Sequence, residues 1–324
     1  MRRKAEEWPI PLLYRPRRQR REAPTGRRAA EHASFRALLV PTDRPGHRVA
    51  VIGDVAGHID ELRTELRRLG ADSATGRLPD DLTVIQVGDL VHRGPASDAV
   101  VALVDGYLTH QPAQWVQLVG NHEAHYLRDP VFHWPERISA RSRDTLRRWW
   151  AEGQMRVATW VRDDSRDNGE SFLITHAGVT AGFWRTALTV TSSAEQAATR
   201  INSLIGANDG ALFRAGTLLH GRRRARSVGP VWAETATELL PSWLATTLPF
   251  SQIHGHDSIF DWQRRRFRAA EDLALLTVVD EEAKHETTAL PGGRIIGVDP
   301  GHGSQPRLPW RAWEIRTRAS PADL

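Results

Sequence analysis

The chain of 324 residues contains no cysteine, which excludes disulfides, thiolate zinc sites and cysteine nucleophiles together. Its apolar share of 40% suffices for a core, but no apolar run approaches the roughly 18 residues of a membrane span, and no secretory signal opens the chain. We therefore expect a cytoplasmic protein without a membrane partner, with room for one large domain or two small ones.

The net charge of +5 is concentrated at the start of the chain. Residues 1–30 carry ten basic and three acidic side chains, and the proline-containing arginine cluster from Arg15 to Arg28 lacks hydrophobic periodicity. This composition predicts a disordered N-terminal arm over residues 1–45. The arm is either a solvated tail, as such clusters commonly are, or an electrostatic clamp for nucleic acid, polyphosphate or an acidic partner.

Strand and helix patterns alternate after the arm. We predict strands over residues 49–52, 82–87 and 115–119, helices from about residue 60 to Gly70 and over 97–108, and a turn or helix over 121–127. Leu62, Leu66 and Leu69 fall on one face of the first helix, with arginines and glutamates opposite. Such alternation is typical of an α/β fold.

The second half of the chain gives weaker patterns. We predict a tryptophan-bearing helix over residues 144–161, which belongs with 195–205 to a helical insertion spanning about 130–165 and 185–225 of a catalytic domain over 46–324. Further strands are predicted over residues 172–175, 251–254, 273–279, 294–298 and 310–315. Trp149, Trp150 and Trp160 are either core residues, the more common role, or a stacking platform for a purine base.

Side chains that bind metals follow the ends of the predicted strands. Five short stretches carry them, namely Gly53-Asp54, Gly88-Asp89, Gly120-Asn121-His122, Thr175-His176 and Gly255-His256. Ligands of α/β sheets bind at the carboxyl ends of the strands, so these side chains are expected to meet. Two divalent cations held by Asp, Asn and His form a site that hydrolyses phosphate esters.

In order and spacing, these stretches resemble the calcineurin-like metallophosphoesterases, whose pattern runs GDxHG, GDxxDRG, GNH with Glu or Asp, HAG or HGG, and GH. The chain reads Gly53-Asp54-Val55-Ala56-Gly57, Gly88-Asp89-Leu90-Val91-His92-Arg93-Gly94, Gly120-Asn121-His122-Glu123, His176-Ala177-Gly178 and Gly255-His256. The likeness covers roughly residues 48 to 316. It implies an α/β (α+β) fold of two facing mixed β-sheets sandwiched by helices.

The resemblance also implies roles for individual residues. Asp54 would bind a first metal ion, Asp89 would bridge it to a second, and Asn121, His176 and His256 would complete the second site. His254, on the same strand face as His256, is a weaker candidate. Two divalent ions are expected: manganese by resemblance, with iron, zinc and magnesium also compatible.

Two further roles follow from the same resemblance. His122 would act as the catalytic acid once a hydroxide that bridges the metals attacks the phosphorus atom, and Arg93 would bind a phosphate oxygen.

Three positions depart from the family pattern. Ala56 replaces a histidine ligand of the first metal, and we expect His58, after the flexible Gly57, to take its place, with His302 as an outside alternative. His92 replaces the aspartate that orients the catalytic histidine in phosphoprotein phosphatases. Val119 replaces a phosphate-binding arginine of those phosphatases, which the bacterial symmetrical diadenosine tetraphosphate hydrolases also lack.

The leading prediction is therefore a metal-dependent phosphoesterase. The stretch Gly88 to Ser97 is similar to GDLVxRGPxS of the diadenosine tetraphosphate hydrolases, which favours a nucleotide polyphosphate as substrate. The alternative substrate is a phosphoprotein, as in a serine/threonine phosphatase. A different class of function is a binding protein in which Ala56 has emptied one metal site.

Overall fold

The computed structural model describes residues 46–130, 134–165, 169–207, 209–216 and 227–316. The predicted N-terminal arm, with its arginine cluster, lies outside these residues, as does part of the predicted insertion. Within the described part of the chain, no helix has the length and apolar character needed to cross a membrane.

The first sheet has five strands in the order β13-β1-β2-β3-β4. They are β1 (Arg48–Ile52), β2 (Leu82–Gln86), β3 (Trp115–Leu118), β4 (Met155–Arg156) and β13 (Trp313–Arg316). The first four are parallel, and β13 joins the edge antiparallel to β1. Because β1, β2 and β3 are parallel, their carboxyl ends lie along one edge, which positions the residues that follow them.

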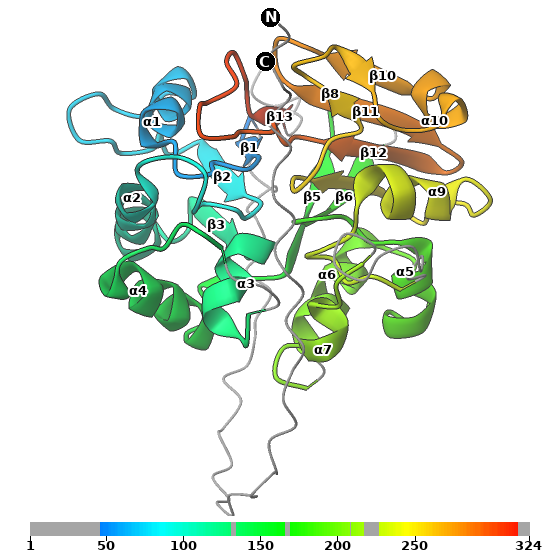
Figure 1. Cartoon of the computed structure of the whole chain (residues 1–324), viewed down its shortest axis with the longest axis horizontal. Helices are drawn as coiled ribbons and strands as arrows, with labels where there is room; N and C mark the ends of the chain where they lie inside the picture. Colours follow the sequence, from blue (N-terminus) through cyan, green and yellow to red (C-terminus); the bar gives the residue numbers. More distant parts are fainter. Residues whose placement is uncertain (1–45, 131–133, 166–168, 208, 217–226, 317–324) are drawn as a thin grey trace, which may run out of the picture.

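Four helices belong to this first half: α1 (Ile59–Arg68), α2 (Ser97–His110), α3 (Asn121–Leu127) and α4 (Ala140–Ala151). Figure 1 shows α1, α2 and α4 on the outer side of β1, β2 and β3. Leu62 and Leu66 of α1 are buried, whereas Arg63 and Arg67 face water. The predicted amphipathic helix is thus confirmed, one face covering the sheet.

The second sheet has six strands in the order β10-β11-β12-β7-β6-β5. They are β5 (Ala158–Asp163), β6 (Glu170–Thr175), β7 (Ser251–His254), β10 (Thr277–Asp280), β11 (His285–Leu290) and β12 (Gly293–Gly297). Its central strands β6, β7 and β12 are parallel, and the others are antiparallel. A separate two-stranded ribbon pairs β8 (Phe260–Asp261) with β9 (Arg266–Phe267).

The remaining helices accompany the second sheet. They are α5 (Ala181–Ala187), α6 (Ala194–Ser203), α7 (Asp209–Leu212), the π-helix η1 (Thr235–Leu239), α9 (Leu240–Trp243) and α10 (Glu271–Leu275). In Figure 1, α5, α6 and α9 lie on the side of the molecule away from α1, α2 and α4. The predicted helix over 195–205 corresponds to α6.

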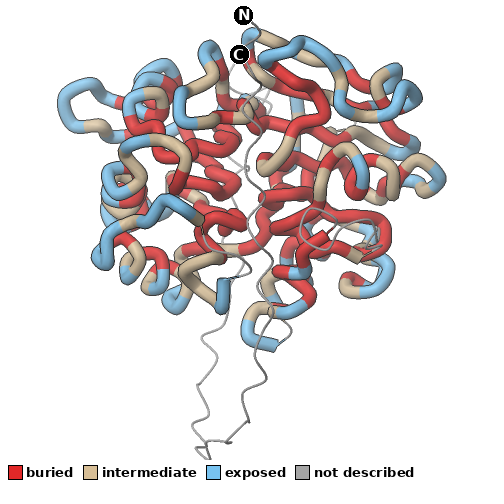
Figure 2. Tube along the Cα trace, in the orientation of Figure 1, coloured by how far each residue is buried: buried red, intermediate tan, exposed pale blue. Residues whose placement is uncertain are grey.

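The two sheets face each other across a shared core. Apolar side chains from both sheets pack in one cluster: Val49, Val51, Ile85, Val87, Leu118, Val161, Phe172, Ile174, Ile253, Ile296, Val298 and Ile315. Figure 2 shows the buried segments gathered at the centre and the exposed ones on the peripheral helices and loops. Two facing mixed sheets with helices outside is the architecture that the family resemblance implies, and it is confirmed.

The single helix predicted over residues 144–161 is wrong. The chain forms α4, turns at Gly153 with a φ of +71°, and continues into β4 and β5. Val157, Thr159 and Val161 are β-branched, which favours a strand once the chain can pair. Because β5 pairs with β6 along its length, residues 158–163 belong to the second sheet rather than to a helical insertion.

The tryptophans of this region have structural roles. Trp149 is fully buried and donates a hydrogen bond from Nε1 to Asp105, and Trp150 packs edge-on against Phe213. Trp160, on β5, is partly buried against the main core. These contacts favour core packing over base stacking for all three.

A second correction concerns the strand predicted over residues 273–279. Its first part is the short helix α10, and β10 begins only at Thr277. Glu271 and Asp272 lie in the first turn of α10, where acidic side chains stabilise a helix. Periodicity over so few residues does not separate a helical turn from a strand, so the apolar pattern predicts one strand here.

Candidate metal centre

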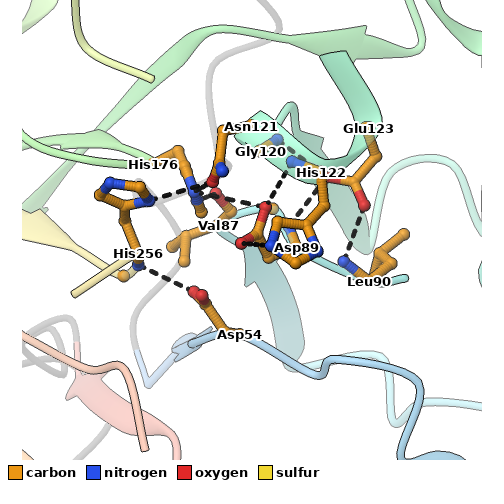
Figure 3. A network of polar contacts seen from close by, with 12 residues as sticks. Asp54, Val87, Asp89, Leu90, Gly120, Asn121, His122, Glu123, His176 and His256 are labelled. Atoms are coloured by element: carbon orange, nitrogen blue, oxygen red, sulfur yellow. Dashed lines mark hydrogen bonds and ion pairs between the residues drawn. The ribbon is translucent and has the colours of Figure 1, made fainter. Parts of the chain in front are cut away.

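The structure brings together the five predicted ligands that follow strand ends. Asp54 follows β1, Asp89 follows β2, Asn121 begins α3 after β3, His176 follows β6 and His256 follows β7. Figure 3 shows them around one point where the two sheets meet. The ligand atoms of Asp89, His176 and His256 all lie within 4.8 Å of one another, which makes this a candidate metal site.

Lone pairs converge at the side chain of Asn121. Its amide oxygen lies 2.9 Å from Nε2 of His176 and 3.0 Å from Nδ1 of His256, and the same position is 3.2 Å from both carboxylate oxygens of Asp89. An oxygen among such acceptors is repelled, so either the amide nitrogen turns inward or a cation lies between them. Oxygen and imidazole donors around one point fit a divalent ion.

The tautomer of His176 strengthens the case for a cation. Its Nδ1 lies 3.0 Å from the carbonyl oxygen of Val87, so this nitrogen donates and Nε2 keeps its lone pair toward Asn121. Burial, together with the charge of His256, lowers the pKa of His176 well below the usual value. A neutral imidazole oriented by a backbone carbonyl is how proteins present a histidine to a metal.

Asp54 carries an oxygen that the protein leaves unpaired. Its Oδ1 accepts a hydrogen bond of 2.9 Å from the backbone N–H of His256, whereas Oδ2 is buried with no hydrogen-bond partner among the described residues. Burial and then the charge of Asp299 raise its pKa well above the usual value. A buried carboxyl group in this state either takes up a proton or binds a cation.

Asp299 is a third buried carboxylate at this site, and it was not predicted as a site residue. It follows β12, and the backbone before it touches the end of β1, because a Cβ on Gly53 would lie 2.0 Å from the carbonyl oxygen of Val298. Burial raises its pKa, and the charge of Arg93 opposes that rise. Three carboxylates near one arginine leave excess negative charge, which a metal ion would neutralise.

Glu123 fixes the loop that carries Asp89. Its carboxylate accepts hydrogen bonds from the backbone N–H groups of Asp89, Leu90 and Gly120, at 2.8, 2.8 and 2.9 Å. The side chain is fully buried, and burial raises its pKa. The family motif includes Glu123, but its role was not predicted, because the backbone groups that it binds become available only through the course of the loop.

Close packing restricts two positions of the centre to glycine. A Cβ on Gly120 would lie 2.2 Å from Oδ1 of Asp89, and one on Gly255 would lie 2.4 Å from Oδ1 of Asp54. Neither contact is sterically possible without moving a carboxylate. The glycine before each ligand therefore permits the close approach of the ligand from the neighbouring strand.

The loop after β2 holds a strained backbone. Asp89, His92 and Arg93 have φ angles of +57°, +72° and +65°, and Ala56 in the facing loop has +49°. Such conformations cost of order 1 to 3 kcal/mol each for residues with a side chain. Strain of this kind concentrates at functional sites, and here it falls on three predicted site residues, Asp89, His92 and Arg93, and on Ala56.

His122 lies at the edge of the centre, against Asp89. Its backbone N–H donates to Oδ1 of Asp89 at 3.0 Å, and its Nε2 lies 3.5 Å from Oδ2 of the same carboxylate. This Nε2 is buried and has no hydrogen-bond partner in the described structure. Burial and the charge of Arg93 lower the pKa of His122 well below its usual value.

The other nitrogen of His122 continues into a chain of side chains. Nδ1 lies 3.0 Å from the carbonyl oxygen of Val91 and 3.1 Å from Nδ1 of His92, and Nε2 of His92 lies 2.5 Å from the hydroxyl of Tyr126. Trp134 covers the imidazole of His122, with ring centroids 4.3 Å apart. Tyr126 and Trp134 were not predicted as site residues.

These contacts determine which atoms carry protons. The carbonyl of Val91 can only accept, so Nδ1 of His122 carries a hydrogen and His92 presents a lone pair. Burial lowers the pKa of His92 to about 4, which keeps its imidazole neutral at neutral pH. His92 therefore orients His122 by a hydrogen bond but, unlike a carboxylate, adds no negative charge beside it.

Arg93 lies on the same loop and is only partly buried. Its Nη1 donates a hydrogen bond of 3.1 Å to the backbone carbonyl of His302, in the loop after β12. Its charge also lowers the pKa of His122, His176 and His256. The guanidinium is thus close to the centre while one of its N–H groups is held by the opposite wall.

His58 is buried beside the centre, but it does not belong to the converging group. Its Nε2 lies 2.9 Å from the carbonyl oxygen of Gly303, and its ring meets that of His302 edge-on at 5.1 Å. A nitrogen that faces a carbonyl carries the hydrogen, which leaves the lone pair on Nδ1. The predicted ligation by His58 is compatible with this tautomer and stays a prediction.

His254 has a separate environment. Its Nδ1 lies 2.8 Å from the carbonyl oxygen of Gly255, and burial lowers its pKa to about 4. Among the described residues, no predicted metal ligand forms a hydrogen bond with Nε2 of His254. Ala56 and Val119 are both buried, and neither offers a ligand atom.

Part of this chain is similar in sequence to a protein of known function. A zinc-dependent endopolyphosphatase of Saccharomyces cerevisiae is 39% identical over 72 residues, which are 22% of this chain and 19% of that protein. The match thus spans about a fifth of that relative's length.

Solved structures give distant likenesses. A cold-active protein tyrosine phosphatase from a psychrophilic Shewanella matches with 18% identity over 61% of each chain and a TM-score of 0.40. A metallophosphoesterase from Sphaerobacter thermophilus matches with 17% identity over 41% of this chain and 47% of that one, with a TM-score of 0.26.

The calcineurin-like phosphoesterase family matches residues 47–208, half of the chain. This match shows that the chain belongs to the calcineurin-like phosphoesterases.

Proposed function

We propose that the protein hydrolyses phosphoanhydride or phosphate ester bonds with two divalent metal ions, manganese being the expected metal. The observation that supports this most is the convergence of lone pairs from Asp89, Asn121, His176 and His256 at one buried point. The unpaired oxygen of Asp54 beside it supports a second ion. A merely structural carboxylate would have both of its buried oxygens paired within the protein.

The residues divide between two ions. Asn121, His176 and His256 would hold one, Asp54 and Nδ1 of His58 would hold the other, and Asp89 would bridge them. His58 takes this place because Ala56 offers no ligand and the contact with Gly303 leaves the Nδ1 lone pair available. When bound, two such ions acidify a water molecule and neutralise phosphate oxygens.

Side chains of the protein would bind the phosphate and supply the proton. Arg93 would bind a nonbridging phosphate oxygen through the N–H groups that His302 does not hold. His122, in its protonated form, would give the hydrogen on Nε2 to the leaving oxygen, while Nδ1 stays bonded to Val91. His92 would keep the ring of His122 in this orientation.

A phosphoanhydride substrate, such as a nucleotide polyphosphate, is favoured over a phosphoprotein. The stretch Gly88 to Ser97 resembles that of the diadenosine tetraphosphate hydrolases, and Val119 cannot bind phosphate as an arginine would. The yeast relative, by its name, acts on polyphosphate. A serine/threonine phosphatase remains the alternative substrate class, while the cytoplasmic location and a binding role for the N-terminal arm stay predictions.

The alternative from another class is a binding protein whose first metal site Ala56 has emptied. The retention of Asp54 and His122, both buried with unpaired atoms, argues against it. In a protein without catalytic activity, each unpaired buried polar atom would lower the stability by about 1 to 3 kcal/mol and give nothing in return.

The test is hydrolysis by the purified protein after manganese reconstitution, and again after zinc. The substrates are diadenosine tetraphosphate, long-chain polyphosphate and a phosphoserine peptide. We expect release of phosphate or nucleotide from one of the anhydrides, and His122→Asn should lower kcat by roughly 100-fold to 10,000-fold.

The matched control is His110→Asn, at the exposed end of α2, which should leave kcat unchanged. Faster hydrolysis of the phosphopeptide than of either anhydride would replace the preferred substrate class. No hydrolysis of any substrate by the metal-loaded protein would support the binding-protein alternative.

A further inference from the structure

The loop after β12 forms one wall of the centre through its backbone. The carbonyl of His302 accepts a hydrogen bond from Arg93, and the carbonyl of Gly303 accepts one from His58. Both partners are residues with proposed roles at the centre. His302 itself is buried, with 2% of its surface exposed, between the half-exposed Gly301 and Gly303.

The imidazole of His302 is oriented so that one nitrogen has no partner. Its Nδ1 accepts a hydrogen bond of 2.9 Å from the backbone N–H of Arg307. Its Nε2 is buried and makes no hydrogen bond to any described residue. The N–H of Arg307 can only donate, so Nδ1 carries the lone pair and the hydrogen is on Nε2.

This tautomer excludes the role considered for His302 from the sequence. A metal ligand must present a lone pair, whereas Nε2 of His302 carries a hydrogen in the neutral ring and in the imidazolium alike. His58 has the opposite arrangement, since the nitrogen facing Gly303 carries the hydrogen and Nδ1 is the lone pair. The two adjacent imidazoles therefore differ in chemistry, one able to bind a cation and the other able only to donate.

A buried donor without an acceptor costs about 1 to 3 kcal/mol in the free protein. The unpaired Nε2 shares this condition with Nε2 of His122 and Oδ2 of Asp54, which belong to the proposed catalytic centre. Arg93 lies beside His302, because its Nη1 donates a hydrogen bond of 3.1 Å to the backbone carbonyl of His302. The acceptor that suits both Arg93 and a neighbouring N–H donor is a phosphate oxygen.

We propose that His302 is a phosphate-binding residue of the centre, which donates a hydrogen bond from Nε2 to an oxygen of the phosphate beside Arg93. The inference rests on the proposed function for its ligand class. It assigns His302 to binding of the phosphate group and not to metal coordination.

The test measures binding of inorganic phosphate to the manganese-loaded protein by calorimetry, together with metal content per chain. We expect His302→Ala to weaken phosphate binding about tenfold, the loss of one hydrogen bond to a charged group, and to leave the metal content unchanged. His302→Gln keeps an N–H donor and should recover most of the affinity. Where a substrate is hydrolysed, KM should rise more than kcat falls.

The matched control is His285→Ala, which removes another buried histidine, on β11, whose Nε2 faces the carbonyl of Arg311. This variant should bind phosphate as the wild type does. Loss of a metal ion in His302→Ala would make His302 a ligand and overturn the proposal, as would unchanged phosphate affinity. If the wild type hydrolyses nothing yet loses phosphate binding with His302→Ala, the proposed function fails while this inference stands.

Discussion

At the scale of single residues, the chemistry of the centre depends on which nitrogen of each buried imidazole carries the hydrogen. His176 and His58 face carbonyl oxygens with one nitrogen and so keep a lone pair on the other. His302 faces an N–H and so keeps a hydrogen. Backbone groups of the neighbouring loops thus decide whether each buried imidazole presents a lone pair or an N–H group on its other nitrogen.

The replacement of an aspartate by His92 should appear in the pH dependence. His92 is neutral and cannot stabilise a positive charge on His122, whose pKa burial already lowers. If His122 must be protonated for catalysis, the activity of the enzyme falls as the pH rises through the pKa of His122. We expect His92→Asp to raise that pKa and to move the alkaline limb of kcat/KM upward by about one pH unit.

The measurement is kcat/KM against pH for the wild type, His92→Asp and the neutral His92→Asn. His92→Asn should keep the wild-type limb, since it adds no charge. An optimum for the wild type that is no lower in pH than that of His92→Asp would contradict this role of His92.

At the scale of elements, the centre depends on loops that follow parallel strands. Asp54, Asp89 and Asn121 follow β1, β2 and β3, so their positions are set by strand register. Glu123, in the first turn of α3, ties the loops after β2 and β3 together through three N–H groups. The helix that begins at Asn121 therefore also fixes the loop that carries Asp89, the proposed bridging ligand.

Glu123→Gln tests this role. The amide keeps one acceptor but replaces the other with a donor that faces N–H groups, so we expect the free energy of unfolding to fall by about 2 kcal/mol. Metal affinity should fall as well, because the loop carrying Asp89 loosens. Urea unfolding and metal titration measure the two effects. Glu195→Gln, on the exposed face of α6, is the control, and equal stability of both variants would refute the role.

The sequence predicted Asp54, Asp89, Asn121, His176 and His256 as candidate ligands because each directly follows a strand and a glycine or threonine. Whether they bind metal stays a prediction. The sequence did not predict Asp299 as a site residue, since its approach to Asp54 depends on contact between the ends of β1 and β12, in different sheets. Tyr126 was missed for a similar reason, as its role comes from a hydrogen bond to His92 on another loop. Such contacts depend on tertiary packing, which periodicity does not report.

At the scale of the whole molecule, the site lies where two sheets meet. Asp54, Asp89 and Asn121 come from the first sheet, and His176 and His256 come from the second. Apolar packing between the sheets therefore holds the candidate ligands of one sheet in place against those of the other. Phe172 of β6 is fully buried in that interface.

Phe172→Ala should destabilise the protein by about 3 to 5 kcal/mol, through lost burial and the cavity left between the sheets. Val278→Ala, whose side chain on β10 is 74% exposed, should change stability by less than about 0.5 kcal/mol. Chemical denaturation compares the two variants with the wild type. Similar losses in both would contradict the assignment of this interface as the core that holds the site.

The most direct test of a two-metal centre rebuilt around Ala56 is the number of metal ions per chain. Elemental analysis after manganese reconstitution would compare the wild type with His58→Ala and with His110→Ala, which removes an exposed histidine. The account predicts two ions in the wild type and in His110→Ala, and one in His58→Ala. Two ions in all three would exclude His58 as the replacement ligand. A single ion in all three would mean that Ala56 has emptied the first site, and would contradict the two-metal centre.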